Sequence, residues 1–129
     1  MLFSLVLVGI GGALGSMLRF LISTLMIKYV CSFFPCGTLV VNLVGSFCIT
    51  FLMELFIFSS IDPIYRYLLI IGFLGGFTTL SSVIYDTLTL FRKGELALAL
   101  FNLLLNYFLS LLFGFFGLLI AKKIIIKGF

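Results

Sequence analysis

The fold of this chain is decided by a stretch without any charged residue, residues 96–121, which reads LALALFNLLLNYFLSLLFGFFGLLIA. A transmembrane helix needs about 20 mostly apolar residues to cross the hydrocarbon core of a bilayer. Three more charge-free windows precede this one, at residues 2–18, 29–53 and 67–85. Four spans are the most that a chain of 129 residues can hold together with its connections. The sequence therefore predicts an all-α integral membrane protein with four transmembrane helices.

The composition excludes several classes of protein. Hydrophobic residues make up 64% of the chain and charged residues only 9%, too few charges to cover a water-soluble surface. There is no histidine and no carboxylate pair at mid-depth of one span, so we do not expect an enzyme. The basic residues are scattered between spans, which argues against nucleic acid as a partner. We expect one four-helix domain, residues 1–129, that crosses the cell membrane several times with lipid around it.

The four spans are expected at about residues 2–27, 37–58, 66–91 and 96–121. Gly11 and Gly15 in the first span have the spacing that lets a neighbouring helix approach closely. The chain has three cysteines and no CxxC pair. An odd count in an apolar chain argues against a disulfide framework, so we expect the cysteines to be small buried apolar residues.

The positive charges divide almost evenly between the two sides of the membrane. With four spans, one side carries Arg66, Lys122, Lys123 and Lys127, and the other side carries Lys28, Arg92 and Lys93. A protein with one fixed orientation usually shows an excess of Lys and Arg on its cytoplasmic loops. We therefore expect copies to insert in both orientations and to pair as an antiparallel, dual-topology dimer.

The third span contains an unusual segment, residues 72–82, which reads GFLGGFTTLSS. Clustered glycines and hydroxyls weaken a helix, and unwound backbone within a membrane persists only where protein or an ion satisfies it. We expect a break in this helix, with a kinked but continuous helix as the alternative. Carbonyl oxygens freed near Gly75 and Thr78 would suit a small hard cation such as sodium.

Polar residues recur at every fourth position in three of the spans. The second span carries Thr38, Asn42, Ser46, Thr50 and Glu54; the third carries Thr78, Ser82 and Asp86; the fourth carries Asn102, Asn106 and Ser110. Each set forms one slanted stripe along a helix with 3.6 residues per turn. The stripes serve either as hydrogen-bonded contacts between helices or as the lining of a polar permeation path.

The chemistry of the stripes favours a small anion over a cation. Most of the residues are neutral donors, and the acids in the spans, Glu54 and Asp86, lie near the span ends. The Asn42 amide and the Ser and Thr hydroxyls can donate hydrogen bonds to an anion that has lost part of its water. Arg19 is the one deep charge; it either faces the path or pairs with a carbonyl or snorkels to the interface.

Three segments of the chain carry a resemblance to a known family. They are GGALG at 11–15 with Arg19 and Phe20, GTLVVN at 37–42 with Gly45, Ser46 and Phe47, and GFLGGFTT at 72–79. With these motifs the chain resembles the Fluc (CrcB-type) fluoride channels along essentially its whole length. The resemblance implies a dual-topology dimer with two fluoride pores, passive fluoride export that gives fluoride resistance, and a structural sodium ion at the dimer centre.

The resemblance also assigns roles to residues. It implies a fluoride pore lined by Thr38, Asn42, Ser46, Thr79, Leu80, Ser81, Val83 and Ser110. Arg19 resembles the arginine of the aqueous vestibule, and the sodium ligands would be the backbone carbonyls of Gly75 and Thr78. One departure stands out, because Leu80 and Val83 occupy positions where the family typically has phenylalanines whose positive ring edges face the anion.

This departure leaves two alternatives open. The chain conducts either as a homodimer with aliphatic walls, or as a half-pore or non-conducting subunit of a heteromeric channel whose partner supplies the phenylalanines. A small multidrug-type proton antiporter is a remote alternative. Such a transporter needs a carboxylate in its first helix, and residues 2–27 contain no Asp or Glu.

Overall fold

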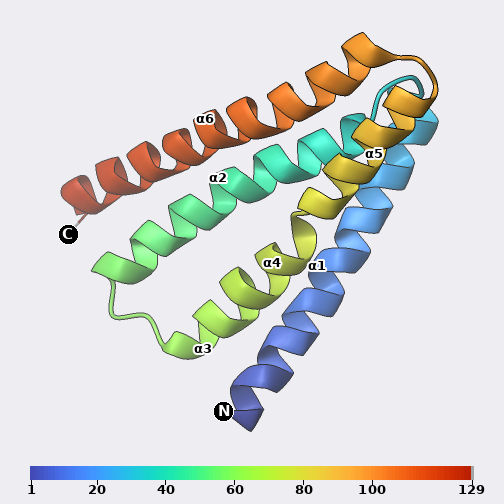
Figure 1. Cartoon of the computed structure of the whole chain (residues 1–129). Coiled ribbons are helices and arrows are strands. Elements are labelled where there is room, and N and C mark those ends of the chain that lie inside the picture. The colour runs from blue at the N-terminus through green and yellow to red at the C-terminus, as the bar shows by residue number, and fades with distance from the viewer. Residues whose placement is uncertain (129) are drawn as a thin grey trace.

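The structure is a computed structural model that describes residues 1–128, and it is a bundle of long helices (Figure 1). Four of them are long and apolar enough to cross a membrane: Leu2–Tyr29, Cys36–Phe58, Pro63–Arg92 and Leu96–Gly128. The prediction of an all-α chain with four spans is confirmed. Phe129, the last residue of the predicted single domain, lies outside the described residues.

Three of the spans are single helices, α1 (Leu2–Tyr29), α2 (Cys36–Phe58) and α6 (Leu96–Gly128). The third span is made of α3 (Pro63–Tyr65), the π-helical segment η1 (Arg66–Leu74), α4 (Gly75–Phe77) and α5 (Leu80–Arg92). Both termini and the connection from α2 to α3 lie at one end of the bundle, and the other two connections lie at the opposite end (Figure 1). This arrangement matches the distribution of loops that four crossings require.

Helix α6 continues beyond residue 121, where the apolar stretch ends. Its last two turns contain Lys122, Lys123 and Lys127. Lysine has a high helix propensity, so the helix extends past the apolar region without a breaker residue. At its other end, Gly94 has a φ of 78° in the connection from α5, a conformation that glycine adopts without steric cost.

Helix α1 packs closely against the first half of the third span through two glycines. A Cβ atom at Gly11 would overlap the carbonyl oxygen of Leu68, and one at Gly15 would overlap the carbonyl oxygen of Phe73. The helices therefore meet backbone to backbone, as the small-residue spacing in the first span predicted. This contact fixes the position of η1 relative to α1.

The backbone is extended at the junction between α4 and α5. Thr78 has φ −78° and ψ 154°, and Thr79 has φ −154° and ψ 118°. The Thr78 hydroxyl and amide both donate to the carbonyl oxygen of Leu74, at 3.0 Å each. Thr79 is the N-cap of α5, since its Oγ1 accepts from the amide of Ser82 at 3.2 Å. Both ends of the junction are thus held by threonine side chains.

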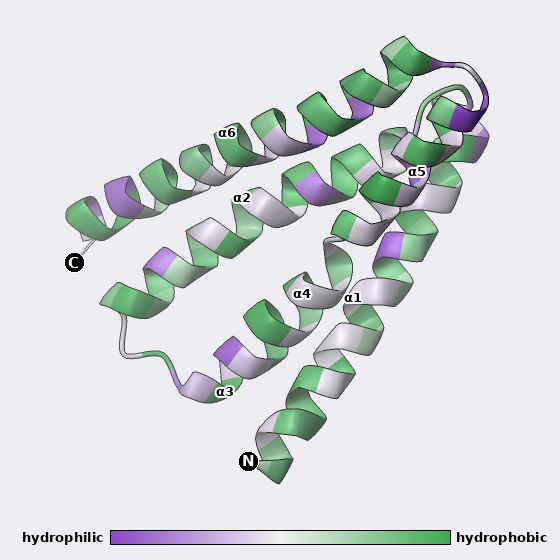
Figure 2. Ribbon diagram, in the orientation of Figure 1, coloured by the Kyte–Doolittle hydropathy of each residue, from purple (hydrophilic) through white to green (hydrophobic). Residues whose placement is uncertain are grey.

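The core of the bundle is small, and the outer faces are apolar. Val41, Leu74 and Phe77 form the buried centre, where α2 meets the third span. Large hydrophobic residues such as Phe108 and Leu111 are exposed on the outside. Figure 2 shows that hydrophobic residues cover much of the long helices, α6 above all, and that the connection between α5 and α6 is hydrophilic. Such a surface is suited to lipid or to another membrane subunit.

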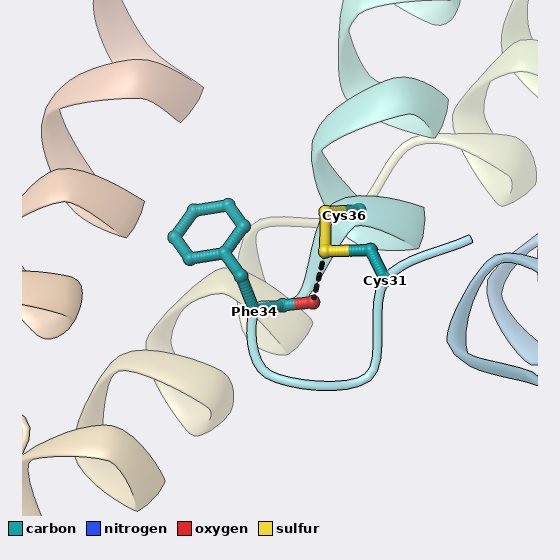
Figure 3. The surroundings of a disulfide bond; sticks show 3 residues. All are labelled: Cys31, Phe34 and Cys36. Carbon is teal, nitrogen blue, oxygen red and sulfur yellow. Dashed lines mark hydrogen bonds between the residues drawn. A yellow bond between two sulfur atoms is a disulfide. The ribbon is translucent and has the colours of Figure 1, made fainter.

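The connection between α1 and α2 contains a disulfide between Cys31 and Cys36, whose Cα atoms are 6.1 Å apart (Figure 3). The expectation that all three cysteines act as unpaired apolar residues is therefore wrong for these two, and only Cys48 is free. The two residues are five positions apart, and the turn between them brings their side chains together. The spacing is not a CxxC pair, so the search for that motif missed it.

Candidate ion pathway

One polar cavity has a volume of about 550 Å³ and lies between α1, the start of α2 and the start of α5. Its lining consists of Ser16, Arg19, Phe20, Ser23, Ile27, Pro35, Gly37, Thr38, Ser81, Ser82, Tyr85 and Asp86. We call it the outer cavity. It brings together three predicted site residues, Arg19, Thr38 and Ser81. It also contains an acid and further serines from other positions.

The side chain of Arg19, which lines the outer cavity, is held in place by a backbone carbonyl group. Its Nε donates to the carbonyl oxygen of Gly76 at 3.1 Å. That carbonyl belongs to the last turn of α4, where helix carbonyls lack intrahelical partners. The predicted alternatives for Arg19 are therefore compatible, because this side chain both lines the cavity and pairs with a carbonyl.

Thr38 is buried and faces a carboxylate in the same cavity. Its Oγ1 donates to Oδ2 of Asp86 at 2.8 Å. The bond joins the first turn of α2 to α5. Asp86 was seen in the sequence only as the end of a polar stripe, and its position opposite Thr38 depends on how α5 packs against α2.

The second cavity, which we call the inner cavity, has a volume of about 280 Å³. Its lining consists of Asn42, Ser46, Thr78, Thr79, Leu80, Val83, Asn106, Tyr107 and Ser110. Six of the eight predicted pore residues lie here, namely Asn42, Ser46, Thr79, Leu80, Val83 and Ser110. The structure thus divides the predicted pore lining between two cavities, with Thr38 and Ser81 in the outer one.

A cluster of hydroxyl groups joins the two cavities. Thr79 Oγ1 lies 3.1 Å from Ser81 Oγ and donates to Ser82 Oγ at 3.1 Å. Thr79 lines the inner cavity, and the two serines line the outer cavity. Hydroxyls can rotate between donating and accepting, so this cluster offers a polar connection between the cavities.

Asn42 is bound to the extended junction on both sides of its amide. Its Oδ1 accepts from the amide of Thr79 at 2.9 Å, and its Nδ2 donates to the carbonyl oxygen of Thr79 at 3.0 Å. The second hydrogen on Nδ2 is directed to Oδ1 of Asn106 at 3.0 Å. Asn42 therefore holds the backbone of the junction in place and has no spare N–H group in this conformation.

Ser110 of the inner cavity differs from Asn42 in its hydrogen bonding. Its Oγ is buried, and among the described residues it has no hydrogen-bond partner. A buried hydroxyl without a partner is uncommon and costs free energy, so it marks a place where a ligand or water would be stabilised. It is a buried hydroxyl in the lining of this cavity that can donate to a ligand.

The two aliphatic residues of the predicted pore differ in exposure. The side chain of Leu80 is 57% exposed, whereas that of Val83 is 1% exposed. Leu80 therefore lies on an open wall of the inner cavity, and Val83 is packed within the subunit. Sequence reasoning treated the two positions as equivalent, because it could not tell which face of α5 each one occupies.

The carbonyl oxygens proposed for sodium belong to Gly75, the first residue of α4, and to Thr78, in the extended junction. Gly75 is exposed on the outside of the subunit, and Thr78 is half-buried. The hydrogen bonds described for residues 1–128 use neither the carbonyl of Gly75 nor that of Thr78 outside helical ladders. These two oxygens are chemically suited to a hard cation.

The stripe on α2 has two functions along its length. Its first half faces the cavities, while Thr50 donates to the carbonyl oxygen of Gly114 on α6 at 2.7 Å. Glu54 lies 3.9 Å from Lys122, also on α6. The two interpretations of the stripe therefore overlap, because Thr38 and Asn42 line polar cavities and also bond to side chains of other helices.

Several residues of the two cavities were absent from the predicted site, among them Ser82, Asp86, Asn106 and Tyr107. The first three belonged to the predicted stripes, so the spacing of four residues was a signal that could have included them. Tyr107 gave no signal of this kind, since it lies off the stripe on α6. Its 56% exposure places it at the open edge of the inner cavity beside Leu80.

The chain is similar to known proteins over nearly its full length. Residues 6–118 match the family model described as CrcB-like protein, Camphor Resistance (CrcB). The fluoride-specific ion channel FluC of Sulfurihydrogenibium sp. (strain YO3AOP1) is 41% identical over 91% of this chain and 95% of its own length. The protein of the same name from a Nitratiruptor species is 46% identical over 90% of each chain. This multi-pass membrane protein therefore belongs to the CrcB family.

Proposed function

We propose that this chain is a subunit of a fluoride-selective channel that lets fluoride leave the cell passively. The similar proteins from two organisms are named fluoride-specific ion channels. The inner cavity of this chain suits a small anion, because hydroxyl and amide groups line it and its lining contains no carboxylate. In the outer cavity Arg19 supplies a positive charge, and the carboxylate of Asp86 accepts a hydrogen bond from Thr38. A channel of this kind needs no catalytic group, and it confers fluoride resistance by exporting the ion.

The observation that carries the proposal is the unpartnered hydroxyl of Ser110 in the inner cavity. An anion that enters a narrow site loses part of its hydration and needs donors in exchange. Ser110 Oγ can donate without breaking an existing bond, whereas Asn42 already uses both of its N–H groups. Fluoride, as a small and strongly hydrogen-bonding anion, gains the most from such a donor.

The pathway also supports assembly as a dimer of oppositely oriented copies. Leu80 and Tyr107, on the edge of the inner cavity, are both more than half exposed, so one subunit leaves this wall open. A second copy would close it. The near balance of positive charges on the two sides agrees with copies that face opposite ways.

The broken third helix would contribute a structural sodium site at the centre of this dimer. Gly75 and Thr78 would supply backbone carbonyl oxygens from each copy, giving four oxygen ligands in two copies. Gly75 is exposed, which allows a partner to approach it. Sodium would act here by joining the third spans of the two copies. The anion path would lie elsewhere in each subunit.

A second candidate function is that of one subunit in a heteromeric channel. The observation in its favour is the aliphatic pair Leu80 and Val83 in the inner cavity. Without aromatic edges from its own α5, the cavity would rely on a different subunit for them. Both functions require the same fold and the same cavities.

Fluoride efflux from liposomes that contain only this chain tests the proposal. We expect rapid efflux of fluoride, read with a fluoride electrode, and no efflux of chloride. The variant Ser110→Ala should conduct more slowly, and Ser110→Thr, which keeps the hydroxyl, should retain more of the flux. A folded protein that passes no fluoride would favour the heteromeric alternative, and equal chloride flux would contradict fluoride selectivity.

The sodium site has its own test. A Cβ atom at Gly75 would have no neighbour closer than 3.8 Å in the subunit, so Gly75→Val should leave the subunit folded. We expect this variant to lose its dimer in detergent, and we expect the original chain to do so when sodium is replaced by N-methylglucamine. Dimers that persist in both experiments would contradict the site.

A further inference from the structure

Three asparagine side chains form a continuous chain of hydrogen bonds through the core of the subunit. Asn42 Nδ2 donates to Asn106 Oδ1 at 3.0 Å, and Asn106 Nδ2 donates to Asn102 Oδ1 at 3.0 Å. Asn102 Nδ2 then donates to Thr87 Oγ1 at 2.9 Å and to the carbonyl oxygen of Val83 at 3.2 Å. We call these three residues the asparagine relay. It connects α2 to α6 and α6 to α5.

The relay is buried and fully paired. The three residues are 9%, 5% and 0% exposed for Asn42, Asn106 and Asn102. Each amide nitrogen uses both of its hydrogens, since Asn106 Nδ2 also donates to the carbonyl oxygen of Asn102 at 2.9 Å. Buried polar networks of this kind specify a single arrangement, because any unpaired member would cost free energy.

Backbone carbonyl groups set the orientation of the side-chain amides in the relay, because a backbone carbonyl cannot exchange its acceptor for a donor. The carbonyl oxygens of Val83 and Asn102 accept only, so they orient the amides of Asn102 and Asn106. Asn106 then presents its oxygen to Asn42, and this fixes the nitrogen of Asn42 toward Asn106. A flipped Asn42 amide would place its oxygen against the oxygen of Asn106 and its N–H groups against the amide of Thr79.

We propose that Asn106, supported by Asn102, is a positioning residue for ion passage that acts through Asn42. It holds the Asn42 amide in the one orientation that binds both the N–H and the carbonyl of Thr79. In this way it keeps the extended junction at the wall of the inner cavity, which Ser110 also lines. The inference rests on the proposed fluoride channel and concerns how the site is held in shape.

The relay differs from ordinary contacts between the same two helices. Thr50 on α2 donates to the carbonyl oxygen of Gly114 on α6 and also to the carbonyls of Ser46 and Phe47. Its hydroxyl has no contact with the junction. The variant Thr50→Val therefore removes a hydrogen bond between α2 and α6 without touching the relay, and it is the matched control for Asn106→Leu.

A double-mutant cycle on fluoride efflux from liposomes tests the proposal. We expect Asn106→Leu to lower the flux about tenfold, because it leaves the buried amide of Asn42 without its partner. If Asn106 acts through Asn42, combining this change with Asn42→Ala should lower the flux little further than Asn42→Ala alone. The change Arg19→Gln affects the outer cavity and not the relay. In the double variant, the fold reductions in flux from Arg19→Gln and Asn106→Leu should therefore multiply.

A spectroscopic readout separates positioning from a general loss of structure. In protein labelled with ¹⁵N-asparagine, the Asn42 side-chain signals are identified by their absence in Asn42→Ala. We expect Asn106→Leu to shift these signals, and we expect Thr50→Val to leave both the signals and the flux unchanged. The proposal would be overturned if the Asn42 signals stay in place in Asn106→Leu. It would also be overturned if the fold reductions in flux from Asn106→Leu and Asn42→Ala multiply in the double variant. A wild-type chain without fluoride flux would instead contradict a conducting homodimer, and the spectra would still test the relay.

Discussion

The guanidinium of Arg19 on α1 donates through Nε to the carbonyl oxygen of Gly76, 57 positions later in the chain, at 3.1 Å. The bond places a positive charge beside the extended junction, on the side of the outer cavity. It also satisfies a carbonyl at the end of α4 that has no partner within the helix. Arg19 therefore has two separable properties, its charge and its fixed Nε donor.

Two substitutions of Arg19 separate these properties. Arg19→Lys keeps the charge and loses the Nε donor, while Arg19→Gln loses both. We expect fluoride flux in liposomes to fall in both variants and to fall further in Arg19→Gln. The difference between the two should shrink at high ionic strength, since salt screens the attraction between the charge and the anion. Equal fluxes at low salt would show that the charge does not attract the ion.

A glycine comparison tests the close contact between α1 and the third span. A side chain at Gly15 would overlap the backbone of Phe73, whereas a Cβ atom at Gly9 has no neighbour within 4 Å. We expect Gly15→Val to lower the free energy of unfolding in detergent by at least about 1–3 kcal/mol, the usual cost of overpacking. Gly9→Val carries the same helix-propensity change and should unfold like the original chain. Similar losses in both variants would mean that a valine side chain anywhere on α1, and not the contact with the third span, is responsible.

The two aliphatic positions of the inner cavity should respond differently to phenylalanine. Leu80 is 57% exposed, so Leu80→Phe should fold and assemble normally. Its ring edge would stabilise the anion, and we expect the fluoride flux of the homodimer to rise. Val83 is 1% exposed, so Val83→Phe should destabilise the subunit by about 1–3 kcal/mol. Flux measurements and thermal unfolding in detergent check both expectations.

Opposite results at these positions would change the interpretation. If Leu80→Phe leaves the flux of a conducting homodimer unchanged, the aliphatic wall does not limit conduction. If Val83→Phe is as stable as the original chain, the packing around α5 is looser than the structure indicates.

The disulfide between Cys31 and Cys36 can be tested by counting free thiols. In denatured, unreduced protein, a maleimide carrying polyethylene glycol should react once, at Cys48. After reduction it should react three times, and in Cys48→Ser the two counts should be zero and two. Three adducts before reduction would show that the bond is absent. The Sγ of Cys31 lies 3.4 Å from the carbonyl oxygen of Phe34 (Figure 3), so the reduced thiol could donate a hydrogen bond there.

Much of the fold followed from the sequence alone, because membrane spans are specified locally. Each span must satisfy its own backbone within about 20 apolar residues, so the number of spans could be read from windows of composition. The first helix begins at Leu2 and the second ends at Phe58, as in the expected spans 2–27 and 37–58. The π-helical segment η1 gave no such signal, since neither composition nor spacing distinguishes it from an α-helix.

The candidate site was predicted as a set of residues but not as an arrangement. The spacing of four residues identified the polar stripes, yet it could not decide which stripe residues face a cavity and which join helices. Thr38 and Thr50 belong to the same stripe, and only one of them lines a polar cavity with Arg19. That difference depends on where α5 and α6 approach α2.

The sequence by itself determined the membrane class, the four spans, the close contact at Gly11 and Gly15, and the residue types available to an anion. These properties depend on composition and on spacing within one helix. Only the tertiary structure decided that Asn42 holds the backbone of Thr79 while Ser110 remains without a partner. The physical reason is that a hydrogen bond between helices depends on their relative rotation and depth, which packing sets and which no single span encodes.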